Sequence, residues 1–287
     1  MRRSSFYTPL VILPTSGRWL LLLAQRTALA AGRGLGLWRL VEMGATIFNS
    51  WTDCPVVGPD GAPFWIDLRN GGFEYLVYGW RTSEVEPLIR GLREDAIVLD
   101  IGANVGVWTR LFSSHCKSGH VYAFEPSEPT IKRLERNCQT RANITIISCA
   151  LGAESGKVQF SGNDVDSKLR SMQSSPSAST VAVTTRRLDD WVRENGITRI
   201  DFMKIDVEGF EEEVLIPSID VLERYKPTLC FEFVPEFAGS RSSFRGKQLM
   251  PALRALGYRI FRLDKQGRAF SDFDASEDWT NDYLATM

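Results

Sequence analysis

The chain carries almost no net charge, because 34 lysines and arginines stand against 35 aspartates and glutamates, a formal net charge of −1 at pH 7. No overall field therefore exists to hold nucleic acid, and we expect no nucleic-acid partner. Cysteine and histidine are also scarce: the five cysteines form no CxxC pair, and there are two histidines. This excludes a zinc cluster and a disulfide framework, and it favours small buried thiols in a reducing compartment.

No apolar run reaches the ~20 residues that a membrane-spanning helix needs. The strongest candidate, Trp19–Ala24, is closed by Gln25 and Arg26. The N-terminal segment imitates a signal peptide, but Pro14 and Arg26 interrupt its apolar centre. We therefore expect no membrane span and a cytoplasmic location.

The 287 residues, with 44% hydrophobic and 24% charged side chains, are enough for a large globular core. Residues 1–50 suggest an amphipathic helical N-terminal arm, which packs on the main domain or on a second subunit, so that a homo-oligomer is one expectation. A membrane-surface or partner helix is the alternative. Residues 51–95 read as lead-in strands and a helix, and residues 96–287 as the main domain.

From residue 96 onward, short apolar runs alternate with helical spacing. The runs are typical of parallel strands covered on both faces: Ala96–Ile101, His120–Phe124, Ile144–Cys149, Ile200–Ile205 and Thr228–Val234. Helical spacing lies over Thr109–Ser114, Glu128–Arg141 and Phe210–Tyr225. The alternation predicts a doubly wound, mostly parallel α/β sheet, which Tyr258–Leu263 and a strand near Tyr283 close as a C-terminal antiparallel hairpin.

The most informative stretch is a strand that ends in Asp100 and turns through Gly102, Asn104 and Gly106 into a helix. Glycines let the backbone bend and approach a ligand closely, and the helix start offers free N–H groups. We therefore expect Gly102→Val to abolish ligand binding with little loss of fold. A merely tight strand-to-helix turn is the plainer alternative.

Glu125 ends the next strand, roughly 20 residues beyond the first glycine, where a carboxylate accepts both hydroxyls of a ribose. A dinucleotide fold requires G-x-G-x-x-G, but Asn104 stands at the second glycine. A smaller adenosine ligand fits better, and a dinucleotide-dependent oxidoreductase is the second interpretation.

At this point the sequence resembles the FkbM family of S-adenosylmethionine-dependent methyltransferases, over roughly residues 73–263. The motifs that carry the resemblance are Asp100–Gly106, Ala123–Pro126 with Asn137, Ala150–Gly152 with Ser155 and Gly156, Arg187–Trp191, Lys204–Glu211 and Glu232. The Lys204–Glu211 block is the part most specific to the family, because it follows the Asp100–Gly106 turn and the Ala123–Pro126 motif at this spacing.

The resemblance implies a class I methyltransferase (Rossmann-like) sheet and an S-adenosylmethionine cofactor. It places Asp100, Gly102, Asn104, Gly106, Glu125 and Ala150 at that cofactor. Family members mostly methylate hydroxyls of sugars, glycans or secondary metabolites, so the implied partner is a small-molecule or glycan acceptor. One departure is that Phe233 follows Glu232, where the family often has a histidine.

Methyl transfer from a sulfonium is an in-line displacement, and a hydroxyl acceptor must also lose its proton. Asp206 ends the fourth predicted strand and is the best candidate for the catalytic base or for the acid that orients the acceptor. Glu208, two residues further on, is the second candidate. The alternative role for Asp206 is to cap the helix that follows. With Glu232, these carboxylates could hold a divalent metal, which we do not favour. The run Glu211–Glu213 reads as a solvated helix face.

Two segments stay open. Ser161–Thr180 reads as a polar loop, either a solvated linker or a substrate lid, and Pro235–Arg245 as an acceptor wall or a plain surface loop. Because such loops have no transferable code, the acceptor is not identified. A catalytically silent binding subunit is the remaining alternative to an enzyme.

Overall fold

The computed structural model describes residues 53–68, 86–161, 168–170, 180–207, 209–233, 248–263, 269–272 and 281–287. The expected helical arm, residues 1–50, lies outside them. The chain divides into two compact units: residues 1–82 with 135–140, and residues 83–134 with 141–287. In the described part of the chain, no helix is both long and apolar enough to cross a membrane.

The first unit contains an antiparallel hairpin of β1 (Cys54–Val57) and β2 (Pro63–Ile66). Its turn closes where the N–H of Gly58 donates to the carbonyl of Ala62 at 2.7 Å. Asn137, in the same unit, makes two hydrogen bonds with the backbone of Trp65. Its Oδ1 accepts the Trp65 N–H at 2.7 Å, and its Nδ2 donates to the Trp65 carbonyl at 3.1 Å. A residue that carries the family resemblance therefore holds this hairpin.

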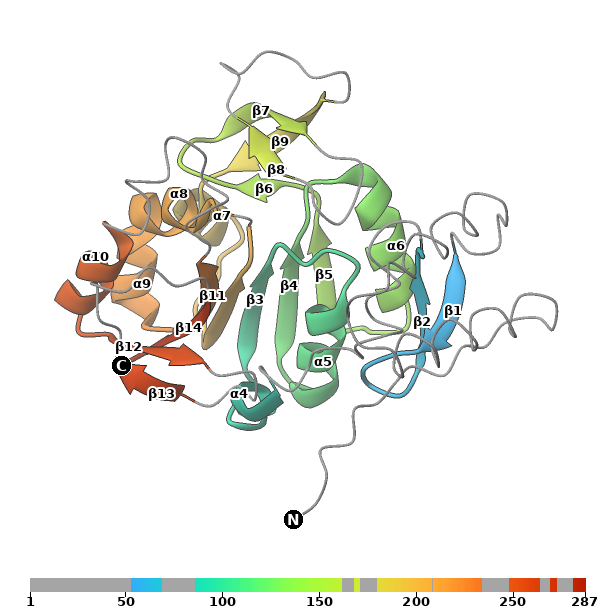
Figure 1. Cartoon of the computed structure of the whole chain (residues 1–287), viewed down its shortest axis with the longest axis horizontal. Coiled ribbons are helices and arrows are strands. Elements are labelled where there is room, and N and C mark those ends of the chain that lie inside the picture. Colours follow the sequence, from blue (N-terminus) through green and yellow to red (C-terminus); the bar gives the residue numbers. More distant parts are fainter. Residues whose placement is uncertain are drawn as a thin grey trace, which may run out of the picture. The chain divides into compact units, whose positions relative to one another are not determined.

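The second unit is built on an eight-stranded sheet in the order β13-β12-β14-β11-β10-β3-β4-β5 (Figure 1). The strands are β3 (Ile97–Ile101), β4 (His120–Phe124), β5 (Ile144–Ile147), β10 (Phe202–Ile205), β11 (Thr228–Phe233), β12 (Arg259–Leu263), β13 (Ala269–Asp272) and β14 (Asn281–Thr286). The five from β11 to β5 pair in parallel, whereas β14 pairs antiparallel with β11 and β12, and β12 with β13. The mostly parallel α/β sheet is confirmed.

Alternate strand residues supply two separate buried clusters, because successive side chains point to opposite faces. Val98 and Phe202 join one cluster with Phe112 of a helix, while Leu99 and Met203 join the other. The helices are α4 (Glu86–Arg90), α5 (Val107–His115), α6 (Glu128–Cys138), α7 (Leu188–Glu194), α8 (Glu211–Leu215), α9 (Ile219–Tyr225) and α10 (Leu249–Ala255). Burial on both faces explains why the parallel strands read as continuous apolar runs.

The continuous helix expected over Phe210–Tyr225 is wrong in one respect. A 3₁₀ turn, η2 (Ile216–Ser218), separates α8 from α9 and contains Pro217. Proline lacks the N–H that an α-helix needs and clashes with the preceding turn, so the helix breaks there.

A second sheet, in the order β6-β9-β7-β8, lies at the end toward which β3, β4 and β5 point (Figure 1). Its strands are β6 (Ala150–Leu151), β7 (Gly156–Ser161), β8 (Lys168–Arg170) and β9 (Thr180–Arg186). Within the segment Ser161–Thr180, expected to be a loop, the described residues 168–170 form strand β8, which pairs antiparallel with β7. The carboxyl ends of the parallel strands, where α/β proteins bind ligands, lie at this same end of the main sheet (Figure 1).

Candidate active site

The turn after β3 is organised around a buried carboxylate. Asp100 is 0% exposed, and its Oδ2 accepts the hydroxyl of Thr109, on α5, at 2.6 Å. Its Oδ1 and the side-chain oxygen of Asn104 are buried and have no hydrogen-bond partner within the described residues. Asn104 lies at φ 50°, a left-handed conformation that asparagine tolerates better than most residues. The turn therefore presents two buried acceptor atoms that a ligand could satisfy.

Glu125, immediately after β4, is 6% exposed and binds this turn. Its Oε2 accepts the N–H of Asn104 at 3.0 Å, and its Oε1 accepts the N–H of Ser127 at 2.9 Å. Burial raises the pKa of Glu125 to about 7, against the two backbone hydrogen bonds that favour its charged form. Each oxygen keeps a second lone pair, so this carboxylate can still accept hydroxyl donors.

Lys204 of β10 supplies the positive charge of the site. Its side chain is 7% exposed, and Nζ lies 2.9 Å from Oδ2 of Asp206, whose side chain is 35% exposed. Burial alone lowers the pKa of Lys204, but the charges of Asp206 and of Asp100, its register partner on β3, outweigh burial and raise it. The ammonium therefore stays charged although it is buried.

The three sequence-predicted carboxylates at these strand ends lie close enough to influence one another. Burial raises the pKa of Asp100, the charge of Lys204 opposes this, and the charge of Asp206 adds to it. The charges of Asp100 and Asp206 likewise add to the raised pKa of Glu125. Asp100 and Asp206 thus share the charge of the Lys204 ammonium, and Glu125 lies within the field of both carboxylates.

Gly102 has a structural role that the sequence analysis did not anticipate. At φ 83°, a Cβ built on Gly102 would lie 1.9 Å from the carbonyl oxygen of Asp206. The expectation that Gly102→Val spares the fold is therefore wrong, because any side chain would force β3 and the end of β10 apart. Gly106, at φ 93°, precedes α5, and Ala150 lies in β6, paired with Thr185.

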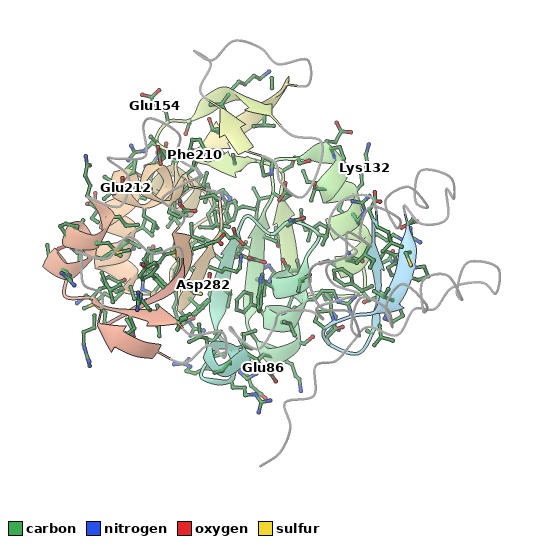
Figure 2. All side chains as sticks on the ribbon, viewed as in Figure 1. Glu86, Lys132, Glu154, Phe210, Glu212 and Asp282 are labelled. Carbon is green, nitrogen blue, oxygen red and sulfur yellow. The ribbon has the colours of Figure 1, made fainter. Side chains whose placement is uncertain are left out.

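Glu208 lies outside the described residues, so its role stays a prediction. Glu232 of β11 is the register partner of Asp282 of β14, which the sequence analysis did not single out (Figure 2). Like charges directly opposite each other in an antiparallel pair repel, so this pairing disfavours two ionised side chains. Even so, the described residues contain no group of three or more His, Cys, Asp or Glu side chains that could hold a metal ion.

The model of the FkbM methyltransferase domain matches residues 100–260, more than half of the chain. The chain belongs to the FkbM methyltransferase family. The matched region begins at Asp100 and includes Glu125, Lys204 and Asp206.

Relatives of this FkbM family member are distant. It is 26% identical to 2-O-methyltransferase NoeI of Sinorhizobium fredii, over 46% of this chain and 61% of the relative. It is 29% identical to hexuronic acid methyltransferase AglP of Haloferax volcanii, over 47% of this chain and 55% of the relative. The chain thus spans less than two thirds of these proteins. A solved FkbM methyltransferase of Methylobacillus flagellatus KT has a TM-score of 0.46 and 17% identity, covering 76% of this chain and 53% of that chain.

Membership of the FkbM family implies use of S-adenosylmethionine, and the residues present fit it. Two buried acceptor oxygens, on Asp100 and Asn104, lack partners within the described residues and could receive a ligand's N–H donors. Glu125 offers acceptor capacity for hydroxyls.

Proposed function

We propose that this FkbM methyltransferase transfers the methyl group of S-adenosylmethionine to a hydroxyl oxygen of a sugar, glycan or secondary metabolite. The observation that carries the proposal is the contrast between two carboxylates on either side of β3. Glu125 is buried and bound to the glycine turn, whereas Asp206 is one-third exposed and anchored by Lys204. One is suited to hold a cofactor, and the other to meet an acceptor.

Glu125 would accept the ribose hydroxyls of the cofactor, and the oxygens of Asp100 and Asn104 would receive its ammonium group. Gly102, Gly106 and Ala150 would line the same ligand. When bound, the cofactor supplies an electrophilic methyl group on a positively charged sulfur. The protein's contribution is then to hold donor and acceptor in line, and alignment of this kind lowers a barrier by up to about 7–11 kcal/mol.

Asp206 would orient the acceptor hydroxyl and take its proton as the new carbon–oxygen bond forms and the methyl–sulfur bond breaks, leaving S-adenosylhomocysteine. Lys204 engages Oδ2 from the buried side, so the carboxylate is fixed rather than free to rotate. Help from a general base is worth about 10²–10⁴-fold in rate. Glu208 is the second candidate for this role.

The names of two relatives favour an oxygen acceptor on a carbohydrate. NoeI is named a 2-O-methyltransferase, and AglP a hexuronic acid methyltransferase. We therefore expect a hydroxylated sugar among the acceptors of this chain.

Calorimetry with S-adenosylmethionine, S-adenosylhomocysteine and NAD tests the cofactor. Transfer of tritium from methyl-labelled S-adenosylmethionine to a panel of neutral sugars, uronic acids and hydroxylated metabolites tests the reaction, and mass spectrometry locates the methyl group. We expect both adenosyl ligands to bind, NAD not to bind, and the label to appear on oxygen. Binding of NAD alone would indicate an oxidoreductase, and cofactor binding without any transfer would indicate a silent binding subunit.

A further inference from the structure

The glutamate run Glu211–Glu213 is not the solvated helix face that its sequence suggests. Glu211, the first residue of α8, is 3% exposed. Glu212 follows it in the first turn of α8, after the N-cap residue Phe210; both are labelled in Figure 2. A buried carboxylate at a helix end costs free energy unless it is hydrogen-bonded, so the partners of Glu211 indicate why it is there.

Glu211 binds the backbone that follows Asp206. Its Oε1 accepts the N–H of Val207 at 3.3 Å and the N–H of Gly209 at 3.2 Å. Gly209 has φ 90°, a left-handed conformation that favours glycine. One carboxylate oxygen thus closes the turn that leads from β10 into α8.

The other end of this turn is fixed by β3. The N–H of Asp206 donates to the carbonyl of Ile101 at 2.9 Å, and the carbonyl of Asp206 packs against Gly102 so closely that no Cβ fits. The backbone of Asp206 is therefore held on one side by the sheet and on the other, through Val207, by Glu211. Burial chiefly raises the pKa of Glu211 to about 7, and the charge of Asp206 contributes, as expected for nearby carboxylates.

We propose that Glu211 is a positioning residue of the methyl-transfer site, whose buried carboxylate fixes the backbone at Val207 and Gly209 and thereby the carboxylate of Asp206. The proposal rests on the function proposed above for Asp206. Lys204 restrains the side chain of Asp206, whereas Glu211 restrains its backbone. Residues that hold a catalytic group in this way keep it within the narrow range of positions that an in-line reaction needs.

Glu212 provides a matched control within the same helix. Its Oε1 accepts the N–H of Gln248 at 2.9 Å and that of Leu249 at 2.8 Å, at the start of α10. The two neighbouring glutamates therefore each accept two backbone N–H groups, but only Glu211 acts on the turn next to Asp206. Substitution of each by glutamine replaces the carboxyl group by an amide and keeps one carbonyl oxygen.

The test compares Glu211→Gln and Glu212→Gln by amide hydrogen exchange, calorimetry with S-adenosylmethionine, and tritium transfer to the acceptor that the panel identifies. In Glu211→Gln we expect the rate of amide hydrogen exchange at Val207 and Gly209 to rise about 10-fold. We expect kcat to fall at least 10-fold, while the affinity for S-adenosylmethionine stays within about 3-fold of wild type. In Glu212→Gln we expect faster exchange at Gln248 and Leu249 and an unchanged kcat.

Unchanged exchange at Val207 and Gly209 in Glu211→Gln, or equal losses of kcat in both variants, would overturn the proposal. If Glu211→Gln does not fold, Glu211→Asp, which keeps the charge but shortens its reach, takes its place under the same criteria. Failure of the wild-type protein to bind S-adenosylmethionine or to transfer its methyl group would instead remove the proposed function. The two failures are therefore distinguishable.

Discussion

Lys204 and Asp206 form an ion pair, with 2.9 Å between Nζ and Oδ2, in which the ammonium is buried and the carboxylate is one-third exposed. The pair links the interior of the sheet to the surface of the site. Asp100, fully buried on the neighbouring strand, is the second carboxylate whose charge Lys204 balances.

Replacement of Lys204 by methionine should therefore destabilise the protein by about 3 kcal/mol, because removal of one partner leaves buried Asp100 without a counter-charge. The loss should shrink at acidic pH, where Asp100 is neutralised by a proton. Lys204→Arg, which keeps the charge, is the control. Urea unfolding at pH 5 and pH 7 measures the effect, and equal stability of Lys204→Met and wild type at pH 7 would contradict it.

Glu125 should make the stability of the cofactor-free protein depend on pH. Its pKa is about 7 in the folded protein against 4.5 for an ordinary glutamate, so between these values the folded state binds more protons than the unfolded state. Stability therefore falls as pH rises from about 4.5 to about 7, by up to about 3 kcal/mol, and is level above.

Chemical denaturation of wild type and Glu125→Gln across pH 4.5–8 isolates this contribution. The contributions of all other titrating groups cancel when the unfolding free energy of one protein is subtracted from that of the other. Glu211, whose pKa is also raised to about 7 by burial, contributes to both proteins alike. A pH-independent difference would contradict the prediction.

Binding of S-adenosylmethionine should release protons near pH 6.5. Ribose hydroxyls donate hydrogen bonds to the charged form of Glu125 and so favour loss of its proton. Calorimetry in two buffers of different ionisation enthalpy counts the protons, and affinity should rise from pH 5.5 to 7.5. In Glu125→Gln both effects should vanish; a wild-type protein that binds the cofactor without proton release would exclude Glu125 as the ribose ligand.

Gly102→Ala should lower stability by about 3 kcal/mol or more, because the new Cβ overlaps the carbonyl of Asp206 and the residue lies at positive φ. Gly152→Ala is the matched control, since a Cβ there meets nothing within 4 Å. Thermal unfolding of both variants is the measurement. A Gly102→Ala protein as stable as Gly152→Ala would show that the strands can separate without cost.

The sequence predicts those parts of the molecule whose cause is local. Apolar runs locate the parallel strands, and the glycine turn and Glu125 follow from their spacing after strands. Lys204 and Asp282 were not predicted as site residues, because strand register brings them beside distant acids. For the same reason Glu211 was misread: its partners are backbone N–H groups, which leave no trace in composition.

Asp206→Asn should separate chemistry from structure. The side chain of Asp206 binds Lys204 and does not cap the following helix, which begins five residues later at Glu211 and has no side-chain cap at Phe210. The helix-cap interpretation of Asp206 is therefore wrong. Asparagine keeps an oxygen that can accept a hydrogen bond from Lys204, but it loses the charge that would take a proton.

We therefore expect Asp206→Asn to bind S-adenosylmethionine within a few-fold of wild type and to turn over at least about 10²-fold more slowly. Tritium transfer at saturating cofactor measures turnover, and calorimetry measures binding. Near-normal turnover would end the catalytic role of Asp206, leaving Glu208 as the candidate. As a companion measurement, the wild-type protein is treated with EDTA. If EDTA abolishes its activity and Mg²⁺ restores it, a metal ion is favoured over a carboxylate base, because a bound cation can acidify the acceptor hydroxyl directly.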